Sequence, residues 1–268
     1  MTTVEPSDTA ADGDDVLHSG AAGGRVVRGG AIRVAGFGVG VLFGLGTSAL
    51  LLRHLGVVDY GKYGTIAALL GLVLALSDGG LTTIGARELA TTEAGPRRVA
   101  TASTLMFLRL VTTSLGVVIA IVFAAVAYAT AELTLGAALV GASVVLISMQ
   151  AMATVPLLVS LRIAPMTGFE VLRHALSFLG VLVLVLADAG LTWFFTLQIP
   201  IAAILLLLTV VYVRRSFPIG VRFDRVAALR LARETLPMAV ASTMVVLYGG
   251  AMVIIVSLIA SDYQTGLY

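Results

Sequence analysis

The feature that most constrains this chain is a pair of long apolar stretches separated by a very short polar turn. Residues 34–52 contain no charged side chain, and residues 64–86 carry only Asp78 and no other charge. Each stretch is close to the ~20 apolar residues that a helix needs to cross a bilayer. Residues 57–63, between them, read VVDYGKY and leave room only for a reversal of direction. The two stretches therefore predict a transmembrane helical hairpin with a tight loop over residues 57–63.

The rest of the chain repeats this arrangement, and composition agrees with it. Charged residues are 12% of the chain, about half the share usual in soluble domains, and the mean hydropathy is +1.04. A soluble core could not hide so many apolar segments of helical length. The sequence therefore predicts an all-α polytopic transmembrane helix bundle. The expected spans are residues 34–52, 64–86, 102–128, 135–161, 169–187, 193–213 and 236–260.

Lysine and arginine fall mainly in alternate connections between these spans. With the N-terminus placed in the cytoplasm, the outer segments carry only Arg53 and Lys62, against thirteen basic residues in the cytoplasmic segments. Cytoplasmic loops of membrane proteins carry such an excess, so the pattern predicts a cytoplasmic N-terminus and supports seven spans. The thirteen are Arg25, Arg28, Arg33, Arg87, Arg97, Arg98, Arg162, Arg214, Arg215, Arg222, Arg225, Arg230 and Arg233.

Two segments outside the spans have their own composition. Residues 1–30 combine five acidic residues with small polar ones and few large apolar ones, which predicts a disordered cytoplasmic tail. Residues 214–235 form a basic cytoplasmic linker. Within residues 223–233, basic and apolar residues segregate imperfectly at helical spacing. This pattern fits either a helix lying on the inner leaflet or a solvated charged linker.

The first hairpin carries a resemblance to a known family. Residues 51–64 read LLRHLGVVDYGKYG, and DGGL at residues 78–81 is followed by ARELA at residues 86–90. These runs resemble the first two spans of the polysaccharide-biosynthesis (O-antigen-type) oligosaccharide flippases, which belong to the multidrug/oligosaccharidyl-lipid/polysaccharide exporter superfamily. The resemblance runs from about Arg33 to the end of the chain, and beyond the first two spans it rests mostly on hydropathy and loop lengths.

The resemblance implies two six-helix lobes with twelve to fourteen spans in total. A short internal echo agrees, because Gly266-x-Tyr268 matches Gly61-x-Tyr63 at the corresponding place six spans later. We therefore expect a six-span N-terminal lobe over residues 31–213. Residues 236–268 would be the first span of a truncated second lobe, whose missing C-terminal half is an expected partner. The chain departs from the family at residues 248–251, which read YGGA where members often carry a charged pair.

Two charged residues inside the spans are the leading candidates for a binding site. A charge near the bilayer centre costs at least ~2.5–3.5 kcal/mol, so it is a functional candidate by default. Arg109 could hold a phosphate through two parallel hydrogen bonds, or it could reach to the inner headgroups. Asp78 could accept a coupling proton or Na⁺, could pair with Arg109, or could simply end a helix beside Gly79 and Gly80.

Four further polar residues complete the predicted site. Arg53, inside the family signature, and Gln150, within the fourth span, join Arg109 and Asp78 as substrate-binding candidates. Glu170 and Arg173 stand at the i, i+3 spacing of a local ion pair and could form a gate.

The sequence offers little to suggest an enzyme. We expect no catalytic residue, no cofactor and no metal site, because the three histidines are scattered and the chain has no cysteine. An excess of two basic side chains does not suggest a nucleic-acid partner. A membrane-embedded glycan polymerase or ligase would generally have a large outer loop, whereas the expected outer loops are only a few residues long.

The resemblance implies a carrier of the bacterial or archaeal cytoplasmic (inner) membrane. Its expected partners are the lipid bilayer and a polyprenyl-pyrophosphate-linked oligosaccharide, which it would flip by alternating access. The alternative is a drug/cation antiporter of the same superfamily.

Overall fold

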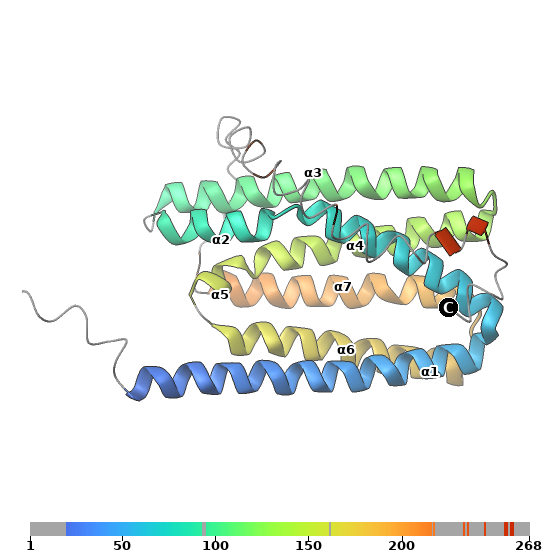
Figure 1. The fold of residues 1–268 in the computed structure, drawn as a ribbon, viewed down its shortest axis with the longest axis horizontal. Coiled ribbons are helices and arrows are strands. Elements are labelled where there is room, and N and C mark those ends of the chain that lie inside the picture. The colour runs from blue at the N-terminus through green and yellow to red at the C-terminus, as the bar shows by residue number, and fades with distance from the viewer. Residues whose placement is uncertain are drawn as a thin grey trace, which may run out of the picture.

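The computed structural model describes residues 20–92, 95–160, 162–215 and 217, together with a few positions between 233 and 259. Every regular element within this part of the chain is an α-helix, and the helices lie side by side in a bundle (Figure 1). They are α1 (Gly20–Asp78), α2 (Leu81–Thr91), α3 (Pro96–Ala127), α4 (Ala131–Ala153), α5 (Val155–Val159), α6 (Ile163–Leu186) and α7 (Leu191–Arg214).

Helix α1 is two helices joined at a single residue. Gly56 has φ 72° and ψ 175°, a conformation open essentially only to glycine, and the chain reverses there (Figure 1). The helix resumes at once, so residues 57–63 are helical and the loop predicted over them is wrong. Asp59 and Lys62 do not mark a loop. They form an i, i+3 ion pair of 3.0 Å on the helix surface. We call residues 20–55 the first half of α1 and residues 57–78 the second half.

Two other predicted spans are interrupted. The second half of α1 ends at Asp78, and Gly79 and Gly80, both with positive φ (45° and 81°), separate it from α2. The fourth span breaks at Thr154, and Pro156 opens the short helix α5, where its missing N–H costs nothing.

Five stretches of the described residues are apolar and long enough to cross a bilayer, and the first of them contains the reversal at Gly56. They are Gly30–Thr91, Pro96–Ala127, Ala131–Val159, Ile163–Leu186 and Leu191–Arg214. Because the first crosses twice, they correspond to the first six predicted spans. The predicted fold class, an all-α polytopic transmembrane bundle, is confirmed.

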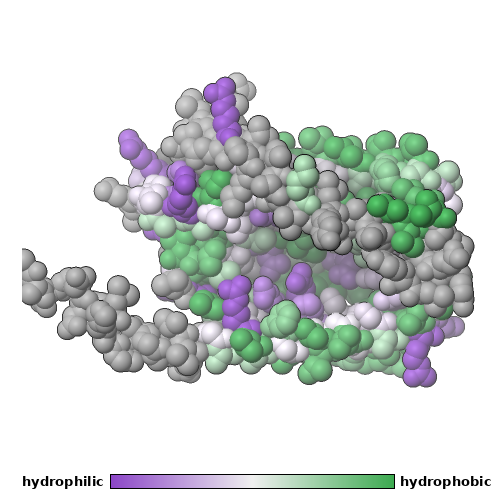
Figure 2. Space-filling view, viewed as in Figure 1, coloured by the Kyte–Doolittle hydropathy of each residue, from purple (hydrophilic) through white to green (hydrophobic). Residues whose placement is uncertain are grey.

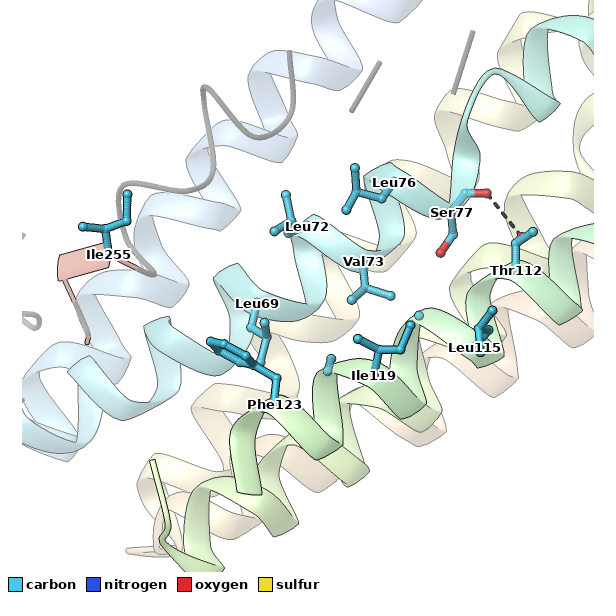
Figure 3. Close-up of a pocket in the computed structure, with 12 residues that line it drawn as sticks. Leu69, Leu72, Val73, Leu76, Ser77, Thr112, Leu115, Ile119, Phe123 and Ile255 are labelled. Atoms are coloured by element: carbon cyan, nitrogen blue, oxygen red, sulfur yellow. Dashed lines mark hydrogen bonds between the residues drawn. The ribbon is translucent and has the colours of Figure 1, made fainter. Parts of the chain in front are cut away.

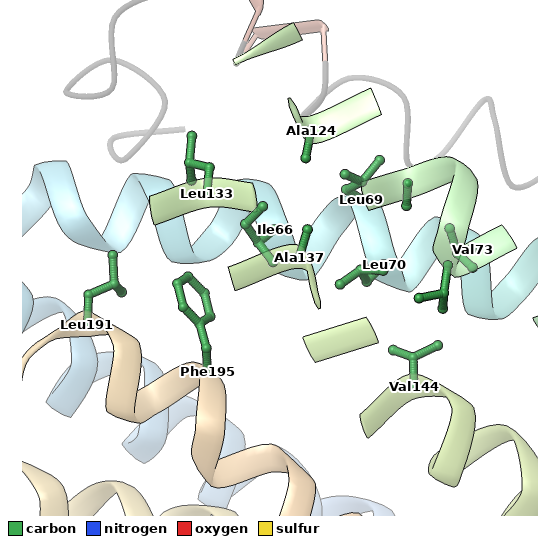
Figure 4. Close-up of a cluster of buried hydrophobic side chains, with 12 residues drawn as sticks. Ile66, Leu69, Leu70, Val73, Ala124, Leu133, Ala137, Val144, Leu191 and Phe195 are labelled. Carbon is green, nitrogen blue, oxygen red and sulfur yellow. The ribbon is translucent and has the colours of Figure 1, made fainter. Parts of the chain in front are cut away.

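The largest apolar core lies where the second half of α1, α3, α4 and α7 meet (Figure 4). The ring of Tyr63 stacks on that of Phe195 at 5.7 Å between centroids, which ties the hairpin to α7. The core residues are Ile66, Leu69, Leu70, Val73, Val117, Ala120, Ala124, Leu133, Ala137, Val144, Leu191 and Phe195.

The glycine-rich face of the first half of α1 packs against α6. A Cβ built on Gly36 would stand 2.2 Å from Cγ2 of Thr167, and one on Gly40 would stand 3.0 Å from the ring of His174. Small residues four apart thus permit the close approach of another helix that their spacing predicts. Gly38, on another face, has no such neighbour within 4 Å.

The outer surface of the bundle is strongly apolar. Phe37, Leu42 and Val126 are 75%, 71% and 78% exposed, as expected for side chains that face lipid rather than water. The turns at Gly56, at residues 128–130 and at residues 187–190 lie at one end of the bundle, and the starts of α3 and α6 lie at the other (Figure 1).

Three predicted segments fall largely outside the described residues. These are most of the tail over residues 1–30, nearly all of the linker over residues 214–235, and most of the span over residues 236–260. Within the described part, α1 already begins at Gly20, eleven residues before the predicted start of the lobe at residue 31.

Candidate functional site

The site begins where α1 stops. Gly79 and Gly80 take left-handed conformations, which end a helix without the clash that a Cβ would cause. Asp78 is therefore the last residue of α1 and faces the first turn of α2. There Thr82 donates a hydrogen bond of 2.5 Å from Oγ1 to Oδ1 of Asp78. A carboxylate beside the first turn of a helix is also stabilised by the helix dipole.

Arg109 completes a buried ion pair with Asp78. It lies near the middle of α3, and its Nη1 donates to Oδ1 of Asp78 at 2.9 Å. The arginine side chain is 3% exposed and the aspartate side chain 35% exposed. A guanidinium this deeply buried requires an opposite charge, and Asp78 supplies it. The side chain of Arg109 therefore lies inside the bundle and does not reach to the headgroups. Of the roles considered for Asp78, the structure contains the pairing with Arg109.

The ion pair leaves hydrogen-bonding capacity unused. Within the described residues, Nε of Arg109 is buried without a hydrogen-bond partner, and so is Oγ1 of Thr113, one turn further along α3. Both protein donors to Asp78 use Oδ1, so Oδ2 accepts no hydrogen bond from the described residues. Buried polar groups are nearly always satisfied, so the unpartnered Nε of Arg109 is a donor to which a further polar group can bind.

The pair lines a cavity of about 420 Å³ between the second half of α1, α3, α4 and α6. In Figure 2, hydrophilic side chains gather in a hollow just above the first half of α1, and the surface around the hollow is largely hydrophobic. The cavity lining is Gly71, Leu74, Ala75, Asp78, Arg109, Ile147, Gln150, Ala151, Thr154, Met166, Phe169, Glu170 and Arg173.

Five of the six predicted site residues meet at this cavity. Gln150 lines it from α4, and its Nε2 donates a long hydrogen bond of 3.4 Å to Oγ1 of Thr209 on α7. Glu170 and Arg173 line it from α6. In the part of the chain that the structure describes, Glu170 and Arg173 form no ion pair with each other. Each presents its charge to the cavity separately.

Arg53 lies elsewhere. It is exposed and stands three residues before Gly56, at the turn of the hairpin. From residue 57 to Asp78 the helix has 22 residues, about 33 Å at 1.5 Å per residue. Arg53 therefore does not line the cavity with Asp78 and Arg109. The prediction placed it with the site because it belongs to the family signature, which says nothing about the end of the bundle at which the site lies.

Three threonines and one aromatic residue join the site without having been predicted. Thr82 binds Asp78, Thr209 binds Gln150, and Thr154 and Phe169 line the cavity. Thr82 stands four residues after Asp78 across two glycines, and this spacing is a sequence signal for its contact with Asp78. Threonines are common in membrane helices, so the other positions give no comparable signal.

The cavity wall is close to electrically neutral. It carries two arginines, Arg109 and Arg173, and two acids, Asp78 and Glu170, with the amide of Gln150 between them. Such a set provides donors and acceptors for a polar ligand, with one strongly desolvated cation at its base. Among the described residues, no group of three histidines or acids lies close enough to hold a metal ion.

Comparison with known proteins identifies no similar protein. No family model, no curated protein and no solved structure matches the chain. The class that fold and site define is a polytopic membrane protein with a polar cavity inside one helical bundle.

Proposed function

We propose that this protein translocates a lipid-linked oligosaccharide across the cytoplasmic membrane by alternating access. The observation that carries the proposal is a buried arginine with free hydrogen-bonding capacity at the wall of a polar cavity, inside a bundle whose outer surface is apolar. The resemblance of the first hairpin to the oligosaccharide flippases agrees with it. The lipid carrier would be a polyprenyl pyrophosphate.

In this proposal Arg109 exchanges one anion for another. Without substrate, its guanidinium holds the carboxylate of Asp78 through a single hydrogen bond. A phosphate presents several oxygens and accepts two parallel hydrogen bonds from a guanidinium, so it competes well with one carboxylate oxygen. The two parallel bonds would come from Nη1 and Nη2, or from Nε and Nη2 on the side of the guanidinium that Asp78 does not use. The buried Nε has no other partner in the described part of the chain.

The remaining cavity residues would contact the sugars. Gln150 offers an amide that both donates and accepts, and Glu170 and Arg173 offer an acceptor and a donor on α6. Sugar hydroxyls need both kinds of partner, and a wall with no large net charge suits a neutral glycan. The polyprenyl chain would stay in the bilayer, where its transfer requires no protein contact.

We place this bundle as one lobe of a two-lobe carrier with its N-terminus in the cytoplasm. Rocking of one lobe against the other would expose the cavity first to one side and then to the other, with an ion gradient as the energy source. In this arrangement Arg97 and Arg214 stand at the cytoplasmic end, which agrees with the usual distribution of basic residues.

One observation favours a second candidate, a drug/cation antiporter. Asp78 is 35% exposed, and its Oδ2 has no hydrogen-bond partner among the described residues. A carboxylate of this kind at membrane depth could bind a proton or an organic cation. The two candidates differ in which residue meets the substrate, Arg109 in a flippase and Asp78 in a cation antiporter.

Reconstituted protein distinguishes them. Proteoliposomes would be loaded with a short polyprenyl diphosphate that carries one fluorescent sugar, and transbilayer movement would be followed with a membrane-impermeant quencher. Loss of a charged hydrogen bond of ~1.5–3 kcal/mol predicts that Arg109→Ala slows movement about tenfold or more. Arg97→Ala, an exposed position on the same helix, is the matched control and is expected to leave the rate unchanged. In vesicles in which the unaltered protein moves the diphosphate, equal rates in both variants would remove Arg109 from the mechanism.

The antiporter is tested in the same vesicles with a pH gradient and a cationic dye. Dye movement that depends on the gradient and disappears in Asp78→Asn, with no movement of the diphosphate, would replace the flippase proposal.

A further inference from the structure

The two halves of α1 form a V whose apex is the turn at Gly56. They start from the same turn and diverge towards the end of the bundle where α2 lies (Figure 1). The polar cavity lies in the wide part of this V, between the second half of α1 and α6. On the second half of α1, its lining residue nearest to the apex is Gly71, and the 15 residues from 57 to 71 measure about 22 Å. The cavity therefore lies towards the end of the bundle that carries Arg97.

Apolar side chains fill the bundle between the cavity and the apex. One buried cluster joins the first half of α1, α6 and α7 through Leu51, Val181 and Phe194, each at most 3% exposed. Beside it, the largest core, which includes Ile66 and Phe195, joins the second half of α1 to α3, α4 and α7. Water needs polar partners to occupy a protein interior, and a closely packed apolar layer offers none. The cavity is therefore sealed from water on the side of the apex.

Two polar contacts attach the apex to neighbouring helices. Nζ of Lys62 lies 3.0 Å from Oε2 of Glu132, in the first turn of α4. Nε2 of His54 lies 2.9 Å from the carbonyl oxygen of Ala189, in the turn between α6 and α7. A carbonyl only accepts, so Nε2 is the donor in this bond. Residues on both sides of Gly56 are thus attached to other elements, and separating the apex from them would break both contacts.

The other end of the bundle is packed differently. The buried cluster there joins α2, α3, α4 and α5, and none of its described members comes from α6 or from the first half of α1. Glu170 on α6 is exposed, and the side chain of Asp78 is 35% exposed. Ionised side chains at membrane depth face protein or a water-filled cavity. The hydrophilic hollow in Figure 2 is the place where water would reach them.

The contact between α1 and α3 offers no polar route to the cavity. Leu69, Leu72 and Leu76, on another face of the second half of α1, line an apolar groove between this helix and α3 (Figure 3). Among the described residues, the groove and the polar cavity share no lining side chain. The cavity is therefore reached from its α6 side and not through the groove.

We propose that the polar cavity is an aqueous vestibule with access from one side only. Water and hydrophilic solutes enter at the end of the bundle that carries Arg97. The apex at Gly56, held by Lys62 and His54, is the closed gate towards the end that carries Thr130. This inference goes beyond the proposed function, because it concerns the path to the site and not the ligand bound there. It applies equally to a flippase and to a cation antiporter, and its test needs no transported substrate.

Cysteine accessibility tests the direction of access, since the chain has no native cysteine. The full chain in sealed membrane vesicles would carry Ala75→Cys, on the cavity wall. A small membrane-impermeant methanethiosulfonate would be added to vesicles of either orientation, and Arg97→Cys and Thr130→Cys would report which end of the bundle faces the reagent. Val183→Cys is the matched control for a position that meets lipid, because Val183 is 62% exposed on α6 and lines neither the cavity nor the groove.

Ala75→Cys is expected to react about tenfold or more faster from the Arg97 side, because a minor conformation open to the Thr130 side would be populated at about 10% or less. Ala151→Cys, on the α4 wall of the same cavity, repeats the measurement in case the first variant folds poorly. Equal rates from the two sides, faster reaction from the Thr130 side, or no reaction at either cavity position would overturn the proposal. Reaction of Val183→Cys at the rate of the cavity positions would show that the reagent enters through lipid, and would also overturn it.

The gate is tested in the same assay by adding Lys62→Glu to the Ala75→Cys protein. The new carboxylate would face Asp59 and Glu132 and be repelled by both. Reaction from the Thr130 side is therefore expected to rise about two- to fivefold, the range of partly exposed charge pairs. Adding Glu132→Lys restores an opposite pair between the hairpin and α4 and should return the rate towards its original value. An unchanged rate in Lys62→Glu, or no rescue by the second change, would overturn the assignment of the gate to this contact.

Discussion

Nη1 of Arg109 lies 2.9 Å from Oδ1 of Asp78, and this contact joins the end of α1 to the middle of α3. The two residues are 31 positions apart, so the contact forms only after the helices have packed. Its energetics are asymmetric, because the arginine is almost fully buried and the aspartate is not. Removing the arginine and removing the aspartate are therefore expected to have different consequences.

Breaking this pair from the aspartate side should destabilise the bundle more than breaking it from the arginine side. Asp78→Asn leaves a buried guanidinium without its counter-ion, which costs about 3 kcal/mol or more. Arg109→Met leaves a carboxylate that still has water and Thr82, and it should cost less. The measurement is the free energy of unfolding in mixed detergent micelles.

The double variant provides the control for that prediction. Asp78→Asn combined with Arg109→Met removes both charges, and its cost should fall below the sum of the single costs by about 1 kcal/mol or more. Strictly additive costs would mean that the two side chains do not interact in the folded protein.

The reversal of the first hairpin should depend on Gly56. Its φ of 72° with ψ of 175° excludes a Cβ, so Gly56→Ala should cost about 1–3 kcal/mol of folding free energy. Gly64→Ala is the matched control, because Gly64 is helical and a Cβ there meets nothing within 4 Å. Alanine at Gly64 should be neutral or slightly stabilising. Equal melting temperatures for the two variants in detergent would contradict the conformation found at Gly56.

The contact between α1 and α6 should depend on Gly36 and not on Gly38. A Cβ at Gly36 would approach Thr167 to 2.2 Å, and the branched threonine side chain has little freedom to move away. Gly36→Ala should therefore destabilise by about 1–3 kcal/mol. Gly38→Ala adds a methyl group where nothing lies within 4 Å and should leave the unfolding free energy nearly unchanged. Similar losses in both variants would show that the helix face is assigned wrongly.

The proposed orientation can be measured with single cysteines. Thr130→Cys is exposed in the turn between α3 and α4, and Arg97→Cys is exposed in the first turn of α3. A membrane-impermeant maleimide added to intact cells should label Thr130→Cys, and should label Arg97→Cys only after the cells are opened. The reverse pattern would place the N-terminus outside the cytoplasm.

The arrangement of crossings could be predicted from the sequence because bilayer thickness sets the length of each apolar stretch. The first six spans follow this rule, and the close packing of the glycine-rich span follows from small residues four apart. The loop predicted over residues 57–63 is wider than the turn at Gly56, because Asp59 and Lys62 resemble loop residues although they pair along one helix face. Hydropathy alone cannot separate a polar loop from a polar first turn.

The sequence predicts most of the residues of the site but not how they are arranged in space. The burial cost of a charge singled out Asp78 and Arg109, and pairing between them was one of several alternatives. That Gln150, Glu170 and Arg173 share their cavity depends on how α4 and α6 pack, which the sequence does not encode locally. The family signature groups Arg53 with these cavity residues, although it lies at the opposite end of the bundle.

The glycines at the two ends of the second half of α1 make it a rod with a pivot at each end. Gly56 and the pair Gly79 and Gly80 all have positive φ, so the angle of the rod is set by a few backbone torsions without loss of its internal hydrogen bonds. Over its length of about 33 Å, a tilt of about ten degrees about Gly56 would move Asp78 by about 6 Å. That displacement is about twice the 2.9 Å between Oδ1 of Asp78 and Nη1 of Arg109. The ion pair therefore forms at only a narrow range of tilt angles of the second half of α1.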